Sequence, residues 1–188
     1  MMGYMEVRAG MLLVASPELA DPNFADTVVL LLDADDEGAM GVVLNRPSPV
    51  PVVSVLADWG DLVAEPEVLF RGGPVSPEGA LAVALVRESG LVPSGLRPVT
   101  DRLAIVDLDA SATDLDEAVD GMRIFAGYAG WGSGQLQAEI EGGDWYVVPS
   151  LPPDAFRADP TDLWRDVLRR QPGELAWHAN RPVDPELN

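Results

Sequence analysis

The sequence contains no cysteine, no lysine and a single histidine, His178, among its 188 residues. Without cysteine there can be no disulfide, no thiolate metal site, no iron–sulfur cluster and no cysteine nucleophile. Without lysine there can be no Schiff-base lysine, no lysine general base and no P-loop lysine on a bound nucleotide. Several large classes of enzyme are therefore excluded before any motif is considered.

Positive charge is scarce as well. Twelve arginines face 31 acidic residues, which gives a formal net charge of −19. A field of that sign repels a phosphate backbone at long range, so broad, sequence-independent binding of nucleic acid is not expected. A local group of arginines could still overcome this field, so binding of nucleic acid at one narrow site is not excluded.

Long hydrophobic runs are also missing. The longest uninterrupted run of valine and leucine, Val28 to Leu32, is far too short to span a membrane, and the N-terminal residues lack the apolar core of a signal peptide. A cytoplasmic protein without membrane association is therefore expected. With 47% hydrophobic residues, the chain is long enough to bury the core of one domain.

The apolar segments predict many strands with a few helices scattered among them. Strands are expected at residues 10–16, 27–33, 40–45, 68–73, 80–86, 103–108, 123–129 and 145–149. Helices are expected at residues 52–64, 113–122, 133–143 and 160–171, the last with Asp159 as N-cap and Pro160 in its first turn. Residues 89–100, rich in glycine, proline and serine, are expected to form a surface loop. Because strands and helices do not alternate strictly, the pattern predicts an α+β fold with a mixed, curved sheet in a single domain, residues 1–188.

The glycine-rich segment GYAGWGSGQ, residues 127–135, is the most unusual stretch of the chain. It lies between a predicted strand and a predicted helix, a context that suits anion binding at a helix N-terminus. Neither the dinucleotide fingerprint nor the P-loop pattern fits, however, and the nearby Glu139 and Glu141 would weaken an anion site. The favoured interpretation is a rigid strand-to-helix turn, with a glycine at positive φ and Trp131 packed beneath it.

Enzymatic chemistry has weak support. Ser133 precedes several aspartates and His178, which is the chain order of an α/β-hydrolase triad, but the G-x-S-x-G motif is missing. His178 is interpreted as a surface residue of the proline-rich tail. The acidic segment from Asp33 to Gly38 begins like a calcium loop, yet Leu44 stands where the bidentate glutamate is required. A hydrolase using Ser133 or a carboxylate-bound metal is thus kept as the alternative, and no catalytic residue, metal or cofactor is assigned.

Two arginines follow predicted strands beside turn residues, in Asn45-Arg46-Pro47 and in the segment FRGGP that contains Arg71. A guanidinium in such a place can clamp a carboxylate or phosphate through two hydrogen bonds. Alternatively, each arginine pairs with some of the abundant carboxylates and fixes its loop. Pairing with carboxylates of the protein is the favoured interpretation, and binding of an anionic ligand by these arginines is kept as the alternative.

In combination, these segments resemble the AlgH/YqgE family of bacterial proteins. The matching stretches run in order from Gly10 to Gln171: GMLLVAS, DPNFADTVVLLL, GAMGVVLNRP, FRGGPV, GYAGWGSGQLQAEIEGGDW and DLWRDVLRRQP. The resemblance implies an α+β fold whose sheet is strongly curved and barrel-like, flanked by several short helices, and a cytosolic location. The family-like core then covers about residues 10–171, and residues 172–188 form a proline-rich tail.

The resemblance also brings the label of transcriptional regulator, which some members carry. No helix-turn-helix with a basic recognition helix is evident in this chain. Many members have a histidine near the position of Ala34 and an acidic residue at the position of Gln137. Chemistry that needs an imidazole or a carboxylate at those two positions is therefore not expected here.

These observations predict a non-enzymatic binding or regulatory module. Its candidate binding residues are polar residues and glycines near strand ends, where sheet proteins often place their sites: Asn45, Arg46, Arg71, Gly72, Gly73, Trp131, Gln135 and Glu139. If the segments converge, Gln135 lies near Arg46 or Arg71. The expected partner is an unidentified small molecule or protein, and a regulator that presents its acidic surface to protein partners is a further alternative.

Overall fold

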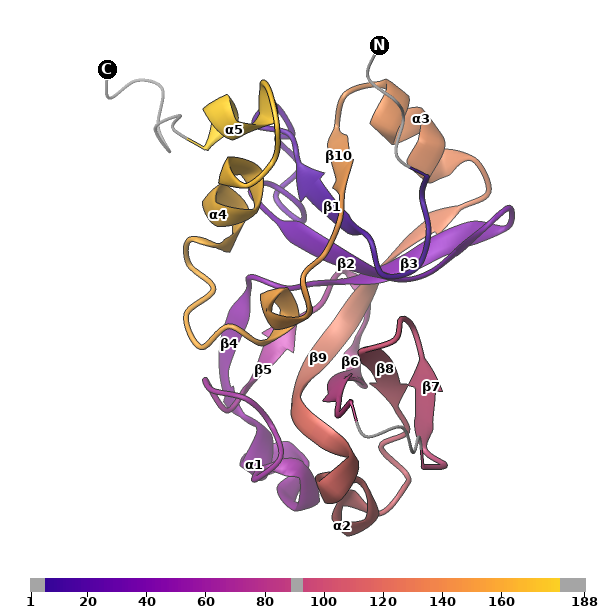
Figure 1. The fold of residues 1–188 in the computed structure, drawn as a ribbon, viewed down its shortest axis with the longest axis vertical. Helices are drawn as coiled ribbons and strands as arrows, with labels where there is room; N and C mark the ends of the chain where they lie inside the picture. Colours follow the sequence, from indigo (N-terminus) through magenta and orange to yellow (C-terminus); the bar gives the residue numbers. More distant parts are fainter. Residues whose placement is uncertain (1–5, 89–92, 180–188) are drawn as a thin grey trace.

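A computed structural model describes residues 6–88 and 93–179 of the chain, and Figure 1 shows how its elements are arranged. In this part of the chain ten strands form one sheet, eight of them in the order β10-β1-β2-β3-β9-β6-β8-β7, with β4 and β5 off this path. The strands are β1 (Leu12–Ala15), β2 (Val28–Asp35), β3 (Gly38–Val43), β4 (Pro47–Pro51), β5 (Val68–Arg71), β6 (Val75–Val86), β7 (Leu96–Pro98), β8 (Leu103–Val106), β9 (Val119–Gly132) and β10 (Trp145–Val148).

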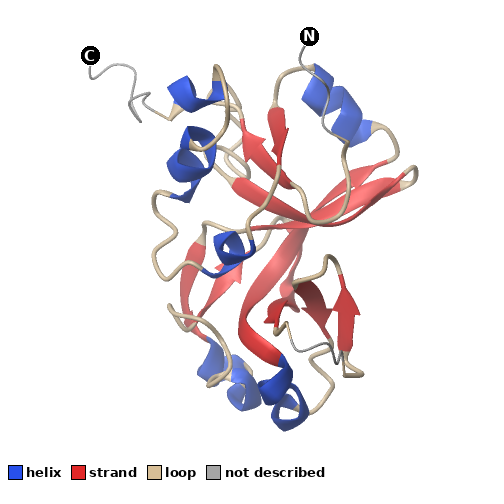
Figure 2. Cartoon of the chain, viewed as in Figure 1, coloured by secondary structure: helices blue, strands red, loops and turns tan. Residues whose placement is uncertain are grey.

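The helices are short and lie around the sheet (Figure 2). They are α1 (Val52–Val55), α2 (Ala112–Leu115), α3 (Gln135–Glu141), α4 (Leu163–Arg169) and α5 (Leu175–His178), with 3₁₀ segments η1 (Ala57–Trp59), η2 (Asp116–Ala118) and η3 (Pro152–Phe156). None of the helices described is long and apolar enough to cross a membrane.

Strand β9 joins the two halves of the molecule. It pairs antiparallel with β3 through Gly130 and with β6 through Ile124, and parallel with β5 through Phe125. Figure 1 shows this strand running from the lower helices α1 and α2 to the upper half that carries α3. The sheet is therefore mixed and strongly curled into a half-barrel, which confirms the predicted α+β class with a mixed, strongly curved sheet.

Strands β1 and β2 are apolar without alternation because both of their faces are covered. Leu12 and Leu30 belong to a core cluster that includes residues of α4, whereas Leu13 and Val29 belong to a second cluster that includes Leu136 of α3. A strand buried on both faces needs apolar residues at every position rather than at every second one. The lower half has a third cluster, in which β6, β8 and β9 pack against α1 and α2.

Two of the predicted helices are much shorter than expected. Residues 52–64 form only α1 and η1, because Leu56 leaves helical geometry at φ −136°, and Val63 forms a bridge with Met122 instead. The prediction of a helix at 113–122 is wrong beyond Ala118, because Val119 begins β9 and pairs with Val86. Pairing with a buried strand outweighs the helical spacing of these apolar residues.

The glycine-rich segment lies mostly in a strand. Strand β9 continues to Gly132, so the turn is confined to Ser133 and Gly134, and Gly134 precedes α3 at φ 75°. The expected glycine at positive φ and the buried Trp131, which is 6% exposed, are confirmed.

Three further expectations about the boundaries are corrected. Helix α4 begins at Leu163, so Asp159 is not its N-cap; the Asp159 carboxylate instead accepts hydrogen bonds from the backbone and hydroxyl of Thr161. The expected surface loop at 89–100 contains β7, while its residues 89–92 lie outside the described part of the chain. The sequence pattern did not predict β4, because its alternating prolines are typical of a loop.

Candidate functional site

The corner between β3 and β4 is fastened to the loop at residues 21–26 by Asn45. Its side-chain oxygen accepts a hydrogen bond from the Val28 backbone N–H at 3.1 Å, and its amide donates to the Asp26 carbonyl at 2.9 Å. Asp26 has a positive φ of 60°, which the two bonds of Asn45 help to hold. Asn45 therefore has a structural role that explains its place at this strand end.

Arg46 completes the fastening. Its Nη1 donates to the Asn23 carbonyl at 2.6 Å, and its Nη2 donates to the carbonyls of Pro22 and Ala25 at 3.0 and 3.1 Å. These bonds use both hydrogens of Nη2 and one of Nη1, so one Nη1–H and the Nε–H have no partner among the described residues. The guanidinium is held in one orientation with two donors to spare.

The electrostatic surroundings of Arg46 are mixed. Burial lowers the pKa of Arg46, the carboxylates of Asp26 and Asp21 act in the opposite direction, and the neighbouring Arg71 lowers it further. Arg46 is therefore partly compensated by two acidic neighbours, and it lies close enough to Arg71 for the two charges to repel.

Arg71 ends β5 directly beside Arg46, because its backbone N–H donates to the Arg46 carbonyl at 2.8 Å. Its side chain is exposed, and it forms no hydrogen bond or ion pair within the part of the chain that the structure describes. A free guanidinium offers five N–H donors in a planar fork. The prediction that Arg71 pairs with a carboxylate is therefore wrong, and Arg46 is held by carbonyls rather than by an ion pair.

Gly72 and Gly73 let this segment approach β9 closely. The Gly72 backbone donates to the Ala126 carbonyl and accepts from Val43, which places it between β3 and β9. A Cβ at Gly72 would overlap the Gly127 carbonyl, and one at Gly73 would overlap the backbone of Tyr128. Only glycine fits at both positions. The close approach of Gly72 and Gly73 to β9 fixes the backbone of the preceding Arg71 beside Arg46.

Together these segments form a pocket of about 260 Å³, called here the Arg46–Arg71 pocket. It is lined by Asn23, Val43, Arg46, Arg71, Gly73 and Pro74. No carboxylate is among the lining residues. Within a strongly acidic protein, this pocket offers hydrogen-bond donors and positive charge.

Gln135 lies far from this pocket. Its side-chain oxygen accepts a hydrogen bond from the Gly132 backbone at 3.0 Å, and Gly132 pairs with Gly38 at the first residue of β3. Arg46 follows the opposite end of β3, and that strand alone is roughly 17 Å long at about 3.3 Å per residue. The expected approach of Gln135 to Arg46 or Arg71 is wrong, because Gln135 caps the turn before α3 instead.

Trp131 and Glu139 belong to an aromatic cluster rather than to the pocket. Trp131 stacks against Phe24 with ring centroids 6.1 Å apart, and Trp145 packs edge-on against both rings at 5.5 to 6.0 Å. Burial raises the pKa of Glu139 and Asp144 adds to this, whereas the nearby indole groups of Trp145 and Trp131 act against it. Phe24 lies in the same loop whose carbonyls hold Arg46, so the aromatic cluster and the Arg46–Arg71 pocket share this loop.

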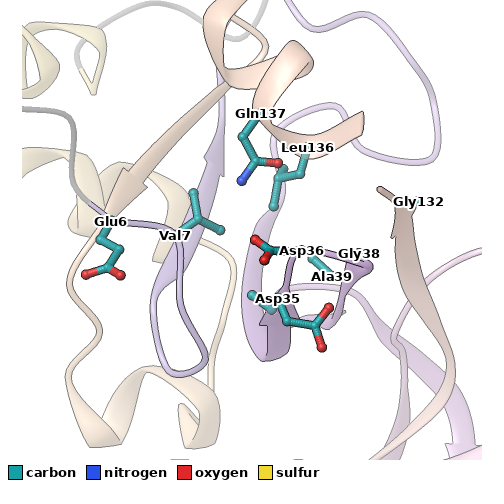
Figure 3. Close-up of a pocket in the computed structure, with 10 residues that line it drawn as sticks. Glu6, Val7, Asp35, Asp36, Gly38, Ala39, Gly132, Leu136 and Gln137 are labelled. Carbon is teal, nitrogen blue, oxygen red and sulfur yellow. The ribbon is translucent and has the colours of Figure 1, made fainter. Parts of the chain in front are cut away.

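A second pocket, of about 310 Å³, opens between α3 and the β2–β3 hairpin (Figure 3). It is lined by Ala34 and Gln137 among others, and Figure 3 shows Gln137 reaching from α3 toward Asp36. Its other charged lining residues, Glu6 and Asp35, are acidic. In residues 6–88 and 93–179, no three histidine or acidic side chains are arranged to hold a metal ion. This second pocket is unsuited to anions.

The residues of the hydrolase alternative do not meet in the described structure. The Ser133 hydroxyl donates to the Asp36 carbonyl at 2.8 Å and therefore has no base as its partner. His178 stacks on Tyr146, with ring centroids 5.7 Å apart, in the short helix α5. It is half-buried there rather than a free surface residue.

The fold defines the class of this protein, which is a small α+β protein with a curled half-barrel sheet. Within that class, the chain belongs to the AlgH-like family, whose profile matches residues 12–176. It is 54% identical to a UPF0301 protein of Streptomyces coelicolor over the whole of both chains, and 47% identical to one of Mycobacterium tuberculosis over 97% of this chain and 91% of that protein.

Two solved structures share the fold. The crystal structure of protein DIP2367 from Corynebacterium diphtheriae superposes with a TM-score of 0.91 at 36% identity, covering 96% of this chain and 95% of that one. The solution structure of the AlgH protein from Pseudomonas aeruginosa has a TM-score of 0.69 at 29% identity, covering 97% and 98%. The predicted family is confirmed, and its biochemical function is uncharacterised.

Proposed function

We propose that this protein is a non-enzymatic binding module that holds a small anion in the Arg46–Arg71 pocket. The observation that carries the proposal is the exposed Arg71 guanidinium, which has no partner among the described residues although the chain has 31 acidic residues. It lies beside Arg46, which three carbonyls hold in place. Such a pair of cations, one fixed and one free to move, suits bidentate binding of an anionic group.

The pocket also favours binding over catalysis. No histidine or carboxylate lines it, so it has no general base or nucleophile to act on a bound anion. A regulatory role, including the transcriptional one implied by the family label, would then act through the bound ligand rather than through direct contact with DNA. The cytoplasm is the compartment that we expect for this activity.

The test is a titration of the isotope-labelled protein with inorganic phosphate and with acetate at low ionic strength, followed by backbone NMR. We expect saturable shifts at Gly72 and Gly73 for at least one anion, and their loss in Arg71→Gln. Arg97→Gln is the matched control, because Arg97 is exposed on β7 and the charge change is the same. If neither anion produces saturable shifts, or if both variants lose them equally, the proposal is wrong.

A further inference from the structure

The charge balance around the Arg46–Arg71 pocket restricts the kind of anion that it can hold. Arg46 interacts with two acidic neighbours, Asp21 and Asp26, whereas Arg71 has no carboxylate partner among the described residues. The pocket therefore offers one cation, Arg71, without a carboxylate partner among the described residues, and a second, Arg46, whose charge is partly compensated. A second negative charge on the ligand would meet the field of a protein with net charge −19 with only this partly compensated cation to offset it.

The donors that remain free favour a flat anionic group. Arg46 has one Nη1–H and its Nε–H left, because three loop carbonyls take the other donors. Arg71 supplies a planar fork that matches the two oxygens of a carboxylate. A carboxylate presents its two oxygens in one plane, as this fork requires, and the remaining N–H groups of Arg46 add further donors.

An apolar surface lies next to these donors. The exposed Pro74 lines the pocket, whereas the lining residue Val43 is buried, and Val75, which follows Pro74 just outside the lining, is 37% exposed at the start of β6. Apolar surface removed from water by a ligand contributes about 25 cal/mol per Å². A ligand with an apolar body beside its anionic group would use both features at once.

From this arrangement we infer that the ligand of the Arg46–Arg71 pocket is a small organic monocarboxylate with a compact apolar body. Arg71 binds the carboxylate through its fork, Arg46 supplies the remaining donors, and the body of the ligand lies against Pro74 and Val75. The inference rests on the proposed function and narrows it to one class of ligand.

The experiment compares four probes with the full chain at pH 8, where inorganic phosphate is mainly the dianion: benzoate, acetate, benzamide and inorganic phosphate. We expect benzoate to bind at least tenfold more tightly than phosphate and more tightly than acetate, and benzamide, which has the same shape without the charge, to produce no shifts. Arg71→Lys keeps the charge but lacks the fork, so it should weaken benzoate severalfold, whereas Arg71→Gln should abolish its binding and Arg97→Gln should leave it unchanged.

The outcomes distinguish a failure of the monocarboxylate inference from a failure of the proposed anion site. If phosphate binds as tightly as benzoate or more tightly, the monocarboxylate inference is wrong while the proposed anion site stands. If acetate binds as tightly as benzoate, or if benzamide does, the inference that the ligand needs both a carboxylate and an apolar body is wrong. If no anion binds, the proposed function fails together with the inference. A heat-unfolding scan of each variant confirms that a lost signal is not a lost fold.

Discussion

At the scale of single residues, Arg123 shows how a buried charge can hold a fold together without an ion pair. It is 1% exposed on β9, and its guanidinium lies 4.1 Å from the centre of the Phe70 ring. Its Nη1 donates to the carbonyls of Ala155 and Arg157, and its Nη2 donates to that of Glu65 at 2.6 Å. Burial lowers the pKa of Arg123 to about 10. One side chain thus ties β9 to two distant loops.

Replacing this clamp should be costly. We expect Arg123→Met to lower the free energy of unfolding by about 2–4 kcal/mol, because the loop carbonyls lose charge-assisted donors in a buried place. Urea unfolding at pH 7 measures the loss. Arg87→Met is the control, because Arg87 is about half exposed and pairs with Asp120 at the surface, which is worth at most about 1 kcal/mol. Equal losses in the two variants would contradict the role of Arg123.

Glu139 provides a prediction of pH dependence. Its pKa is raised by burial and by Asp144, so the folded state holds its proton more tightly than the unfolded state does. Such a group contributes stability at low pH, and that contribution is lost as the pH rises through its folded pKa. Glu139→Gln should therefore stabilise the protein slightly at pH 7, and this advantage should vanish below about pH 4.

The measurement is the difference in unfolding free energy between Glu139→Gln and wild type across pH 3 to 8. Glu141→Gln serves as the control, because Glu141 lies on the same helix and is exposed. We expect only a few tenths of a kcal/mol, since Glu139 is only partly buried and water screens its charge. A variant that is less stable than wild type at pH 7 would show that the carboxylate is stabilised by its neighbours instead.

At the scale of elements, the turn between β9 and α3 depends on backbone geometry rather than on space. A Cβ at Gly134 would meet nothing within 4 Å, but the residue has a φ of 75°, a conformation that side-chain-bearing residues rarely adopt. Gly134→Ala should therefore cost about 1 kcal/mol of stability through backbone strain alone.

Gly132→Ala is the matched control for Gly134→Ala, because its Cβ would meet only the Gln135 side chain, at 4.0 Å, and its φ is not in the left-handed region. Thermal unfolding of both variants tests the prediction. Gly73→Ala should cost more than either, because its Cβ would overlap the backbone of β9. If Gly134→Ala and Gly132→Ala have the same midpoint, strain at Gly134 does not stabilise the turn.

At the scale of the whole molecule, net charge governs which partners can approach. With a formal charge of −19, the protein should not bind duplex DNA more tightly than micromolar at physiological salt. The two arginines at the C-terminal end of α4 do not change this expectation, because Arg169, its last residue, pairs with Asp166, and Arg170, which follows it, pairs with the buried Asp154. A fluorescence titration with generic and genomic fragments is the measurement. Salt-dependent binding tighter than micromolar would require a basic surface that forms only in the complex.

Composition and pattern by themselves determined the fold class, the family and most of the strands. The apolar runs of β1, β2 and β3 are buried on both faces, so consecutive apolar residues in the sequence predict these strands. The pattern was weaker where apolar residues are spaced like a helix but pair with another strand. Residues 119–122 joined β9 for this reason, because the gain comes from β6, which lies more than thirty positions away in the chain.

Only the tertiary structure decided which site residues meet. Local chemistry correctly marked Asn45, Arg46, Arg71 and the two glycines as residues at strand ends, but it also included Gln135, which lies at the other end of β3. Which residues share an end depends on strand register and on the insertion of Gly72 between β3 and β9, and neither is encoded in local spacing. The sequence also could not predict that Arg71 lacks an acidic partner among the described residues. Pairing with one of 31 carboxylates depends on distances that only the folded chain sets.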